Sequence, residues 1–159
     1  MSWMELLSYI ATAVGVPIAV WALIRENQQS KEEAADSIYQ ELSDSYTDFL
    51  KLVIKNPDLQ LLTQPAGLVH TGEALERKTA LFYILISLFE RAYILIHSTD
   101  MSPDVQKHWD SWQDYMQEWC AQKDFINMLP KLLQGEDPEF ALYLRQVAEK
   151  VTSKHNLKS

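Results

Sequence analysis

The hydrophobic pattern begins with one long apolar run. Leu6 to Ile24 contains nineteen consecutive residues without a charge. As a helix this run is about 28 Å long, close to the ~30 Å apolar thickness of a bilayer. We therefore expect a transmembrane anchor over residues 1–25, with Trp3 and Trp21 near its ends.

Two alternatives to an anchor are a cleaved signal peptide and a buried core helix. A signal peptide requires a basic start, whereas the residues before Leu6 include Glu5 and no Lys or Arg. Arg25 and Lys31 follow the run, so the positive-inside rule places the N-terminus outside and the rest of the chain in the cytoplasm.

Apolar positions after the anchor recur at helical spacing. Residues 26–54 lack Gly and Pro and predict a long amphipathic helix continuing from the anchor, stopped by Asn56-Pro57-Asp58. A connector follows, with one helical turn at 58–62. The next helix runs from Thr71 or Gly72 to His97 or Ser98. Its middle, Ala80 to Phe89, is apolar on every face, which predicts a central helix enclosed by others. A second membrane span is the rival interpretation, which the charged pair Glu90-Arg91 disfavours.

Three further helices are expected. Ser102-Pro103 starts one over 103–121, whose aromatic stripe predicts a packing face. Asp124 is expected to cap a short helix that Gly135 closes, and Asp137-Pro138 starts the last helix, before a polar tail from Ser153. The fold class is thus all-α: an anchor (1–25), a cytoplasmic bundle of about four main helices (26–152) and a tail (153–159).

The anchor carries small side chains along one side. They recur at spacings of four, three, four and three: Ser8, Thr12, Gly15, Ala19 and Ala22. Small residues allow membrane helices to approach closely, so this face predicts a homo-oligomer. The alternative is that such residues are simply common in membrane helices. Pro17 removes one backbone hydrogen bond in mid-span.

Charge and composition limit the classes of binding partner and cofactor that this chain is expected to have. The chain has a net charge of −8: residues 1–25 are neutral, residues 26–152 carry −10, and the two lysines of the tail add +2. An acidic body makes nucleic acid an unfavourable partner. The single Cys120 fits a reducing compartment, and no Cys or His spacing is typical of a metal site, so we expect no cofactor and no metal.

One sequence motif contains residues that could be catalytic: Arg91 and His97, in the form Arg-x5-His. It resembles the Arg-x4-6-His signature of HEPN families, small all-α domains that can cleave RNA after dimerisation. That resemblance implies His97 as general acid or base and Arg91 as a group that stabilises phosphoryl charge. The structural alternative is that Arg91 pairs with Glu90 or with an acid on another helix, and that His97 caps the helix as a cation.

The whole layout resembles two groups of bacterial proteins. Trp109-x2-Trp112-x2-Tyr115-x3-Trp119-Cys120 and Asp137-Pro138-Glu139-Phe140 resemble segments of uncharacterised single-pass membrane proteins with a small helical domain. The architecture and Arg91-x5-His97 resemble HEPN-like membrane accessory proteins of RNA-targeting CRISPR systems, which form pores in antiphage defence. We therefore expect a non-catalytic scaffold, sensor or pore-forming accessory of the bacterial inner membrane, with a protein partner as a further expectation. The alternative is a membrane-tethered HEPN-type ribonuclease using Arg91 and His97.

Overall fold

The computed structural model describes residues 26, 30–31, 33–65, 67–99 and 101–156. The predicted anchor and its small-residue face lie outside these residues. The described elements are a first helix over residues 33–55, the 3₁₀ helix η1 (Pro57–Leu59), α2 (Gly72–Ile96), α3 (Pro103–Cys120), α4 (Lys123–Leu132) and α5 (Pro138–Asn156). No strand occurs among the described residues, so the all-α prediction is confirmed for them. The chain divides into two compact units, Met1–Ser37 and Ile38–Ser159.

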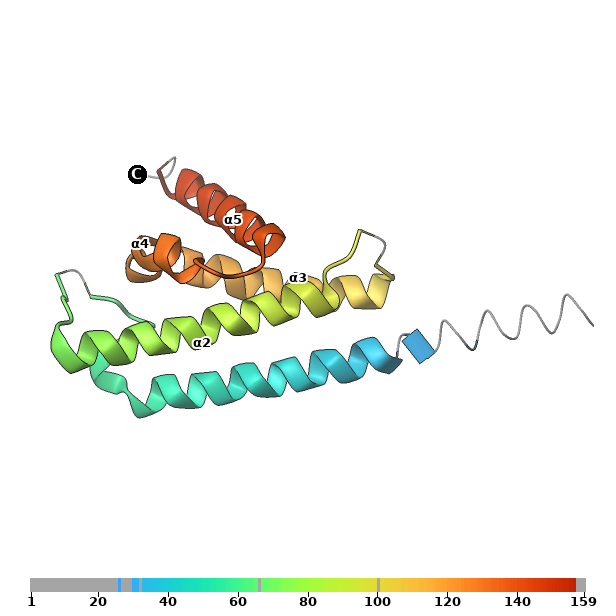
Figure 1. Cartoon of the computed structure of the whole chain (residues 1–159), viewed down its shortest axis with the longest axis horizontal. Helices are drawn as coiled ribbons and strands as arrows, with labels where there is room; N and C mark the ends of the chain where they lie inside the picture. Colours follow the sequence, from blue (N-terminus) through green and yellow to red (C-terminus); the bar gives the residue numbers. More distant parts are fainter. Residues whose placement is uncertain (1–25, 27–29, 32, 66, 100, 157–159) are drawn as a thin grey trace, which may run out of the picture. The chain divides into compact units, whose positions relative to one another are not determined.

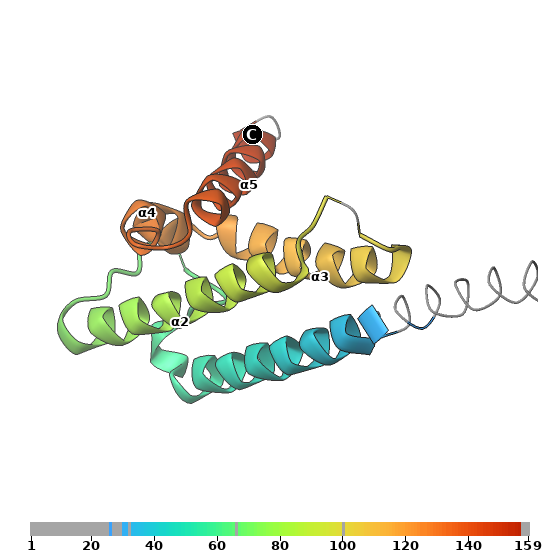
Figure 2. The ribbon, with the colours of Figure 1, turned by 45° about the vertical axis from the view of Figure 1, so that its right-hand side comes forward.

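The first helix and α2 lie side by side in opposite directions, with η1 and the connector at one end (Figures 1 and 2). Helix α3 packs on another side of α2, and α4 and α5 follow it to complete the bundle. Short connections between neighbouring helices favour this antiparallel order.

Helix ends follow the local sequence at several predicted positions. Ser102 caps α3, because its hydroxyl accepts a hydrogen bond from the Val105 N–H at 3.4 Å, and Pro103 occupies the first turn. One carboxylate oxygen of Asp137 accepts from the N–H groups of Glu139 and Phe140 at 3.0 and 2.9 Å, which caps α5. These caps satisfy backbone donors that have no partner within the helix.

Three predicted boundaries are wrong. Helix α4 begins at Lys123 with Gln122 as its N-cap, so Asp124 does not cap it and instead pairs with a lysine. The turn after Asn56 is η1, which is shorter and earlier than the predicted 58–62. Helix α5 continues past Ser153 to Asn156, because polar residues such as Lys154 extend an existing helix without loss.

Aromatic side chains form the centre of the core. Trp109, Trp112 and Trp119 of the α3 stripe are buried, so the predicted packing face is confirmed. The Trp119 indole N–H donates to the Tyr46 hydroxyl of the first helix at 3.0 Å, and its ring lies edge-on to Phe82 of α2. The stripe thus joins three helices through apolar area and one satisfied polar group.

Helix α2 is only partly enclosed. Among the described residues it is the one helix long and apolar enough to cross a membrane, and 44% of its most apolar window is buried. Phe82, Leu85 and Phe89 are fully buried against the bundle, as expected of a core helix. Ile94 on the opposite side is 58% exposed. The prediction of a helix enclosed on every face is therefore wrong for one face.

Candidate functional site

Arg91 lies on the exposed surface of α2, toward the first helix. Its guanidinium contacts the Glu41 carboxylate at 3.3 Å, and both side chains are largely solvated. The alternative of pairing with an acid on another helix is therefore the one that the structure shows. An exposed pair of this kind contributes about 0–1 kcal/mol.

His97 ends α2 but does not act there as a cation. Its backbone N–H donates to the Tyr93 carbonyl at 3.0 Å, while its ring packs against the rings of Tyr93, Trp109 and Tyr143. Burial among these aromatic side chains lowers the pKa of His97. His97 is the C-cap residue of α2, as expected, and the lowered pKa favours the neutral form of its ring over the cation.

The two residues of the Arg-x5-His motif do not share a site within the described chain. Arg91 contacts the first helix, and His97 contacts α3 and α5. Six residues along a helix separate two side chains by about 120° and 9 Å. Acid–base chemistry on a phosphodiester needs both groups on the same reacting atoms, which this arrangement in one copy does not provide.

Sequence reasoning missed a buried polar cluster around Lys78. The Lys78 side chain, in a residue only 5% exposed, contacts an Asp124 carboxylate oxygen at 2.6 Å and His70 Nδ1 at 3.0 Å. An ammonium group only donates, so Nδ1 accepts and the His70 proton resides on Nε2. That nitrogen is buried and has no hydrogen-bond partner in the structure. The cluster joins the connector, α2 and α4.

A signal for this cluster exists in the sequence. Lys78 stands four residues before Phe82 and seven before Leu85, on the stripe that becomes the buried side of α2. A lysine on such a stripe requires a partner. His70 and Asp124 are far apart along the chain, so the spacing by itself did not identify that partner.

A cavity of about 410 Å³ lies beside the cluster, lined by the connector and the α3–α4 corner. Its polar lining groups bond to one another: Gln64 donates to the Gln122 side-chain oxygen at 2.7 Å and accepts from the Asp124 N–H at 3.3 Å. Because these bonds hold the connector against α4, the cavity's polar groups serve the packing of the bundle.

Glu90 and Glu136 form a carboxyl pair between α2 and the turn before α5. Glu90 accepts a hydrogen bond from the Asp137 N–H at 2.5 Å. Burial, followed by the hydrogen bond and charge of Glu90, raises the pKa of Glu136 to about 7. Glu136 therefore keeps its proton to a higher pH than an ordinary carboxyl group, because two adjacent carboxylates repel.

Cys120 and the acidic side chains form no reactive centre of a familiar kind. Burial raises the pKa of the Cys120 thiol to about 12, which disfavours the nucleophilic thiolate. Within the described ranges, no group of three or more His, Cys, Asp or Glu side chains is arranged to hold a metal ion.

Comparison with known proteins identifies no relative of this chain. No family model, curated protein or solved structure matches the chain. The function is accordingly inferred from the residues and their contacts, since an all-α bundle by itself is compatible with many functions.

The Lys78–Asp124 pair predicts an asymmetric response to mutation. Asp124→Asn leaves a buried ammonium without its counter-ion and should lower the free energy of unfolding by about 3 kcal/mol. Lys78→Met leaves a carboxylate that is 32% exposed and can bind water, so its loss should be about 1 kcal/mol or less. Urea unfolding of the full chain in mild detergent, followed by Trp fluorescence, measures both. Asp48→Asn, in an exposed pair with Lys51, is the control. Equal losses for the two variants would contradict this account.

The Glu90–Glu136 pair predicts that stability falls as the pH rises. Between the ordinary carboxyl value of 4.5 and about 7, the folded chain binds more protons at Glu136 than the unfolded chain does. The free energy of unfolding therefore decreases through this window. Glu136→Gln should raise Tm at about pH 8 and reduce the difference from about pH 5. Exposed Glu139→Gln should leave that difference unchanged. Thermal unfolding at both pH values tests this, and an unchanged slope in Glu136→Gln would refute it.

Proposed function

We propose that this chain is a membrane-anchored, self-associating helical protein that acts without catalysis as a scaffold, sensor or pore-forming accessory. The observation that carries the proposal is the uncharged run Leu6–Ile24, which is long enough to cross a bilayer and is followed by Arg25. The bundle then lies in the cytoplasm of a bacterium, at the inner membrane, with the N-terminus outside.

The contacts of the bundle support a non-catalytic role. The polar groups that a reaction would require are engaged with the scaffold itself: Lys78 with Asp124, Arg91 with Glu41, and His97 with aromatic rings. A catalytic pair needs converging groups with access to a substrate. These residues instead bond helices to one another.

Two separate faces support the proposed self-association. The membrane run carries the small side chains Ser8, Thr12, Gly15, Ala19 and Ala22 on one side of a helix. The bundle leaves Ile94 and its neighbours on α2 exposed to solvent. A ring of such chains would assemble a pore, which the resemblance to membrane accessory proteins of antiphage systems also implies. A protein partner that activates the assembly fits the same role.

Oligomer size in detergent tests the membrane face. The full chain should form particles of several chains each. Gly15→Leu should reduce the number of chains per particle, because added bulk separates the helices. Light scattering of the detergent complex gives the mass. Ala13→Leu places the same leucine side chain about 140° away from the small-residue face and should leave the mass unchanged. A parent chain that is monomeric in detergent would refute self-association.

The ribonuclease alternative has its own test. The full chain and the double variant Arg91→Ala, His97→Phe should leave a labelled single-stranded RNA equally intact, because the two residues contact different helices. The Phe ring preserves the aromatic packing around position 97, and circular dichroism checks the fold. Cleavage by the parent chain that the double variant abolishes would establish the nuclease and overturn the proposal.

A further inference from the structure

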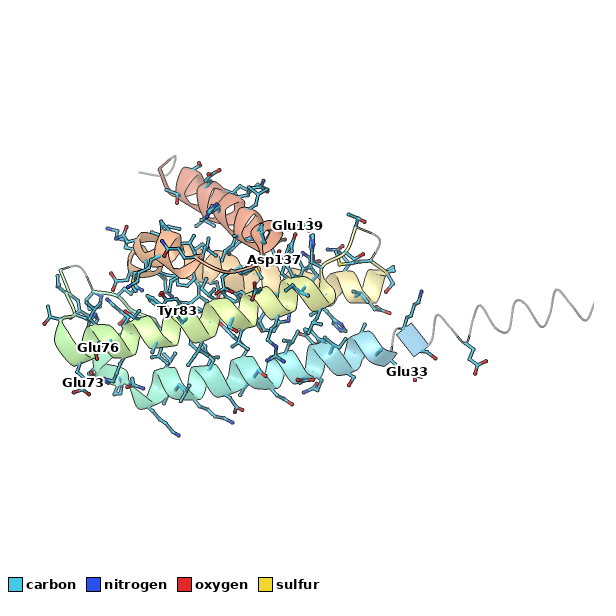
Figure 3. The ribbon with its side chains drawn as sticks, viewed as in Figure 1. Glu33, Glu73, Glu76, Tyr83, Asp137 and Glu139 are labelled. Atoms are coloured by element: carbon cyan, nitrogen blue, oxygen red, sulfur yellow. The ribbon has the colours of Figure 1, made fainter. Side chains whose placement is uncertain are left out.

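One side of α2 faces solvent although most of its residues are apolar or small. The exposed positions Glu76, Ala80, Tyr83, Ser87, Arg91 and Ile94 are spaced four, three, four, four and three apart, which places them on one face, called here the open face of α2. Ile84 and Leu95 border it, 42% and 49% exposed. Figure 3 labels Glu76 near the start of this face and Tyr83 further along α2.

The order of residues on the open face is self-complementary. Its acid, Glu76, lies toward the start of α2, its base, Arg91, lies toward the end, and Tyr83 and Ile84 lie midway between them. If two copies of α2 pack in opposite directions about this midpoint, Glu76 lies opposite Arg91 of the other copy. Ala80 then lies opposite Ser87, and Tyr83 opposite Ile84. Each contact occurs twice, as the two-fold symmetry of a homodimer requires.

The charges on the open face favour an antiparallel pair of α2 helices over a parallel pair. In a parallel pair, Glu76 would lie opposite Glu76 and Arg91 opposite Arg91, and both pairs of like charges would repel. Ala80 and Ser87 are small, so the antiparallel helices can approach closely on both sides of the central Tyr83 and Ile84. Large side chains of one helix can then pack into the grooves that the small side chains leave on the other, as in ordinary helix packing.

Both charges can take part in a further ion pair. Glu76 forms no ion pair with any residue that the structure describes. Arg91 contacts Glu41 through one guanidinium nitrogen at 3.3 Å, which leaves further donors for a second carboxylate. Asp137 and Glu139 lie at the start of α5 (Figure 3), on the side of α2 where Glu90 bonds Asp137. Arg91 lies toward the first helix, and the acid beside it is Glu41 rather than Asp137 or Glu139.

We propose that the open face of α2 binds the same face of a second copy of this chain, antiparallel, with Glu76 of each copy paired to Arg91 of the other. The contact covers the apolar surface that the bundle leaves exposed, which is the part of a monomer's surface that most favours association. It adds to the self-association proposed for the membrane segment, uses different residues, and gives Arg91 a role in assembly.

Cysteine cross-linking in the full chain tests the contact and its direction. Ala80→Cys and Ser87→Cys chains, carrying different tags and co-expressed, should form a mixed disulfide dimer under mild oxidation, whereas either variant alone should form little. The native Cys120 is buried and stays unreactive. Leu142→Cys on α5, exposed but off the open face, is the matched control and should not cross-link. Strong cross-linking of Ala80→Cys with itself would show a parallel pair, and no mixed dimer or equal yield at residue 142 would show no specific contact. Each of these results overturns the proposal.

A charge exchange examines the Glu76–Arg91 pair within the same assay. Glu76→Arg or Arg91→Glu alone should lower the rate of mixed cross-linking about threefold to tenfold, and the two together should restore it. Both side chains are exposed, so the fold should persist, which circular dichroism checks. The mixed dimer should also persist in Gly15→Leu, which separates this contact from the membrane face. Failure of the double exchange to restore the rate, or loss of the dimer in Gly15→Leu, would refute an independent α2 contact.

Discussion

The burial of α2 governs the rest of the bundle. Phe82, Leu85, Ile86 and Phe89 are fully buried within about two helical turns, and burying each such side chain contributes roughly 1.5–3 kcal/mol. The first helix and α3 supply the surfaces that cover them. The aromatic stripe of α3 contacts both α2 and the first helix. The apolar residues of α2 nevertheless extend around more of its circumference than its neighbours cover, so one face remains in solvent.

Buried polar groups determine how the shorter segments attach to this core. Lys78 lies on the apolar side of α2, where an unpaired ammonium would be strongly unfavourable. Its contacts with His70 and Asp124 therefore hold the connector and the start of α4 in one position. At the other end of α2, Glu90 accepts a hydrogen bond from the backbone of Asp137 and so places the start of α5. These groups specify the arrangement of the helices more than they stabilise it.

The same contacts bear on function. A bundle whose His70, Lys78 and His97 are engaged with neighbouring segments presents surfaces for association more readily than converging reactive groups. The apolar run Leu6–Ile24 and the open face of α2 are the two surfaces proposed for association, and they lie on different parts of the chain. Together they support an account in which the chain works by assembling with copies of itself at a membrane.

The sequence by itself determined the helices and their main packing faces. Period-3.6 apolar spacing identified the first helix, α2, α3 and α5, and the local chemistry of Ser102-Pro103 and Asp137-Pro138 identified two helix starts. These features depend on neighbours within about four residues, so they can be recognised without a fold. The motif Arg91-x5-His97 was visible for the same reason, although spacing does not say which way each side chain points.

Only the tertiary structure decided which distant residues meet. Lys78 finds Asp124 across 46 residues and Arg91 finds Glu41 across 50, separations over which sequence pattern carries no information. The structure also decided that α2 has a face without neighbours, because enclosure depends on how many helices pack around it and at which angles. Hydrophobic periodicity is a property of one helix, whereas burial, ion pairing and exposure are properties of the contacts between helices.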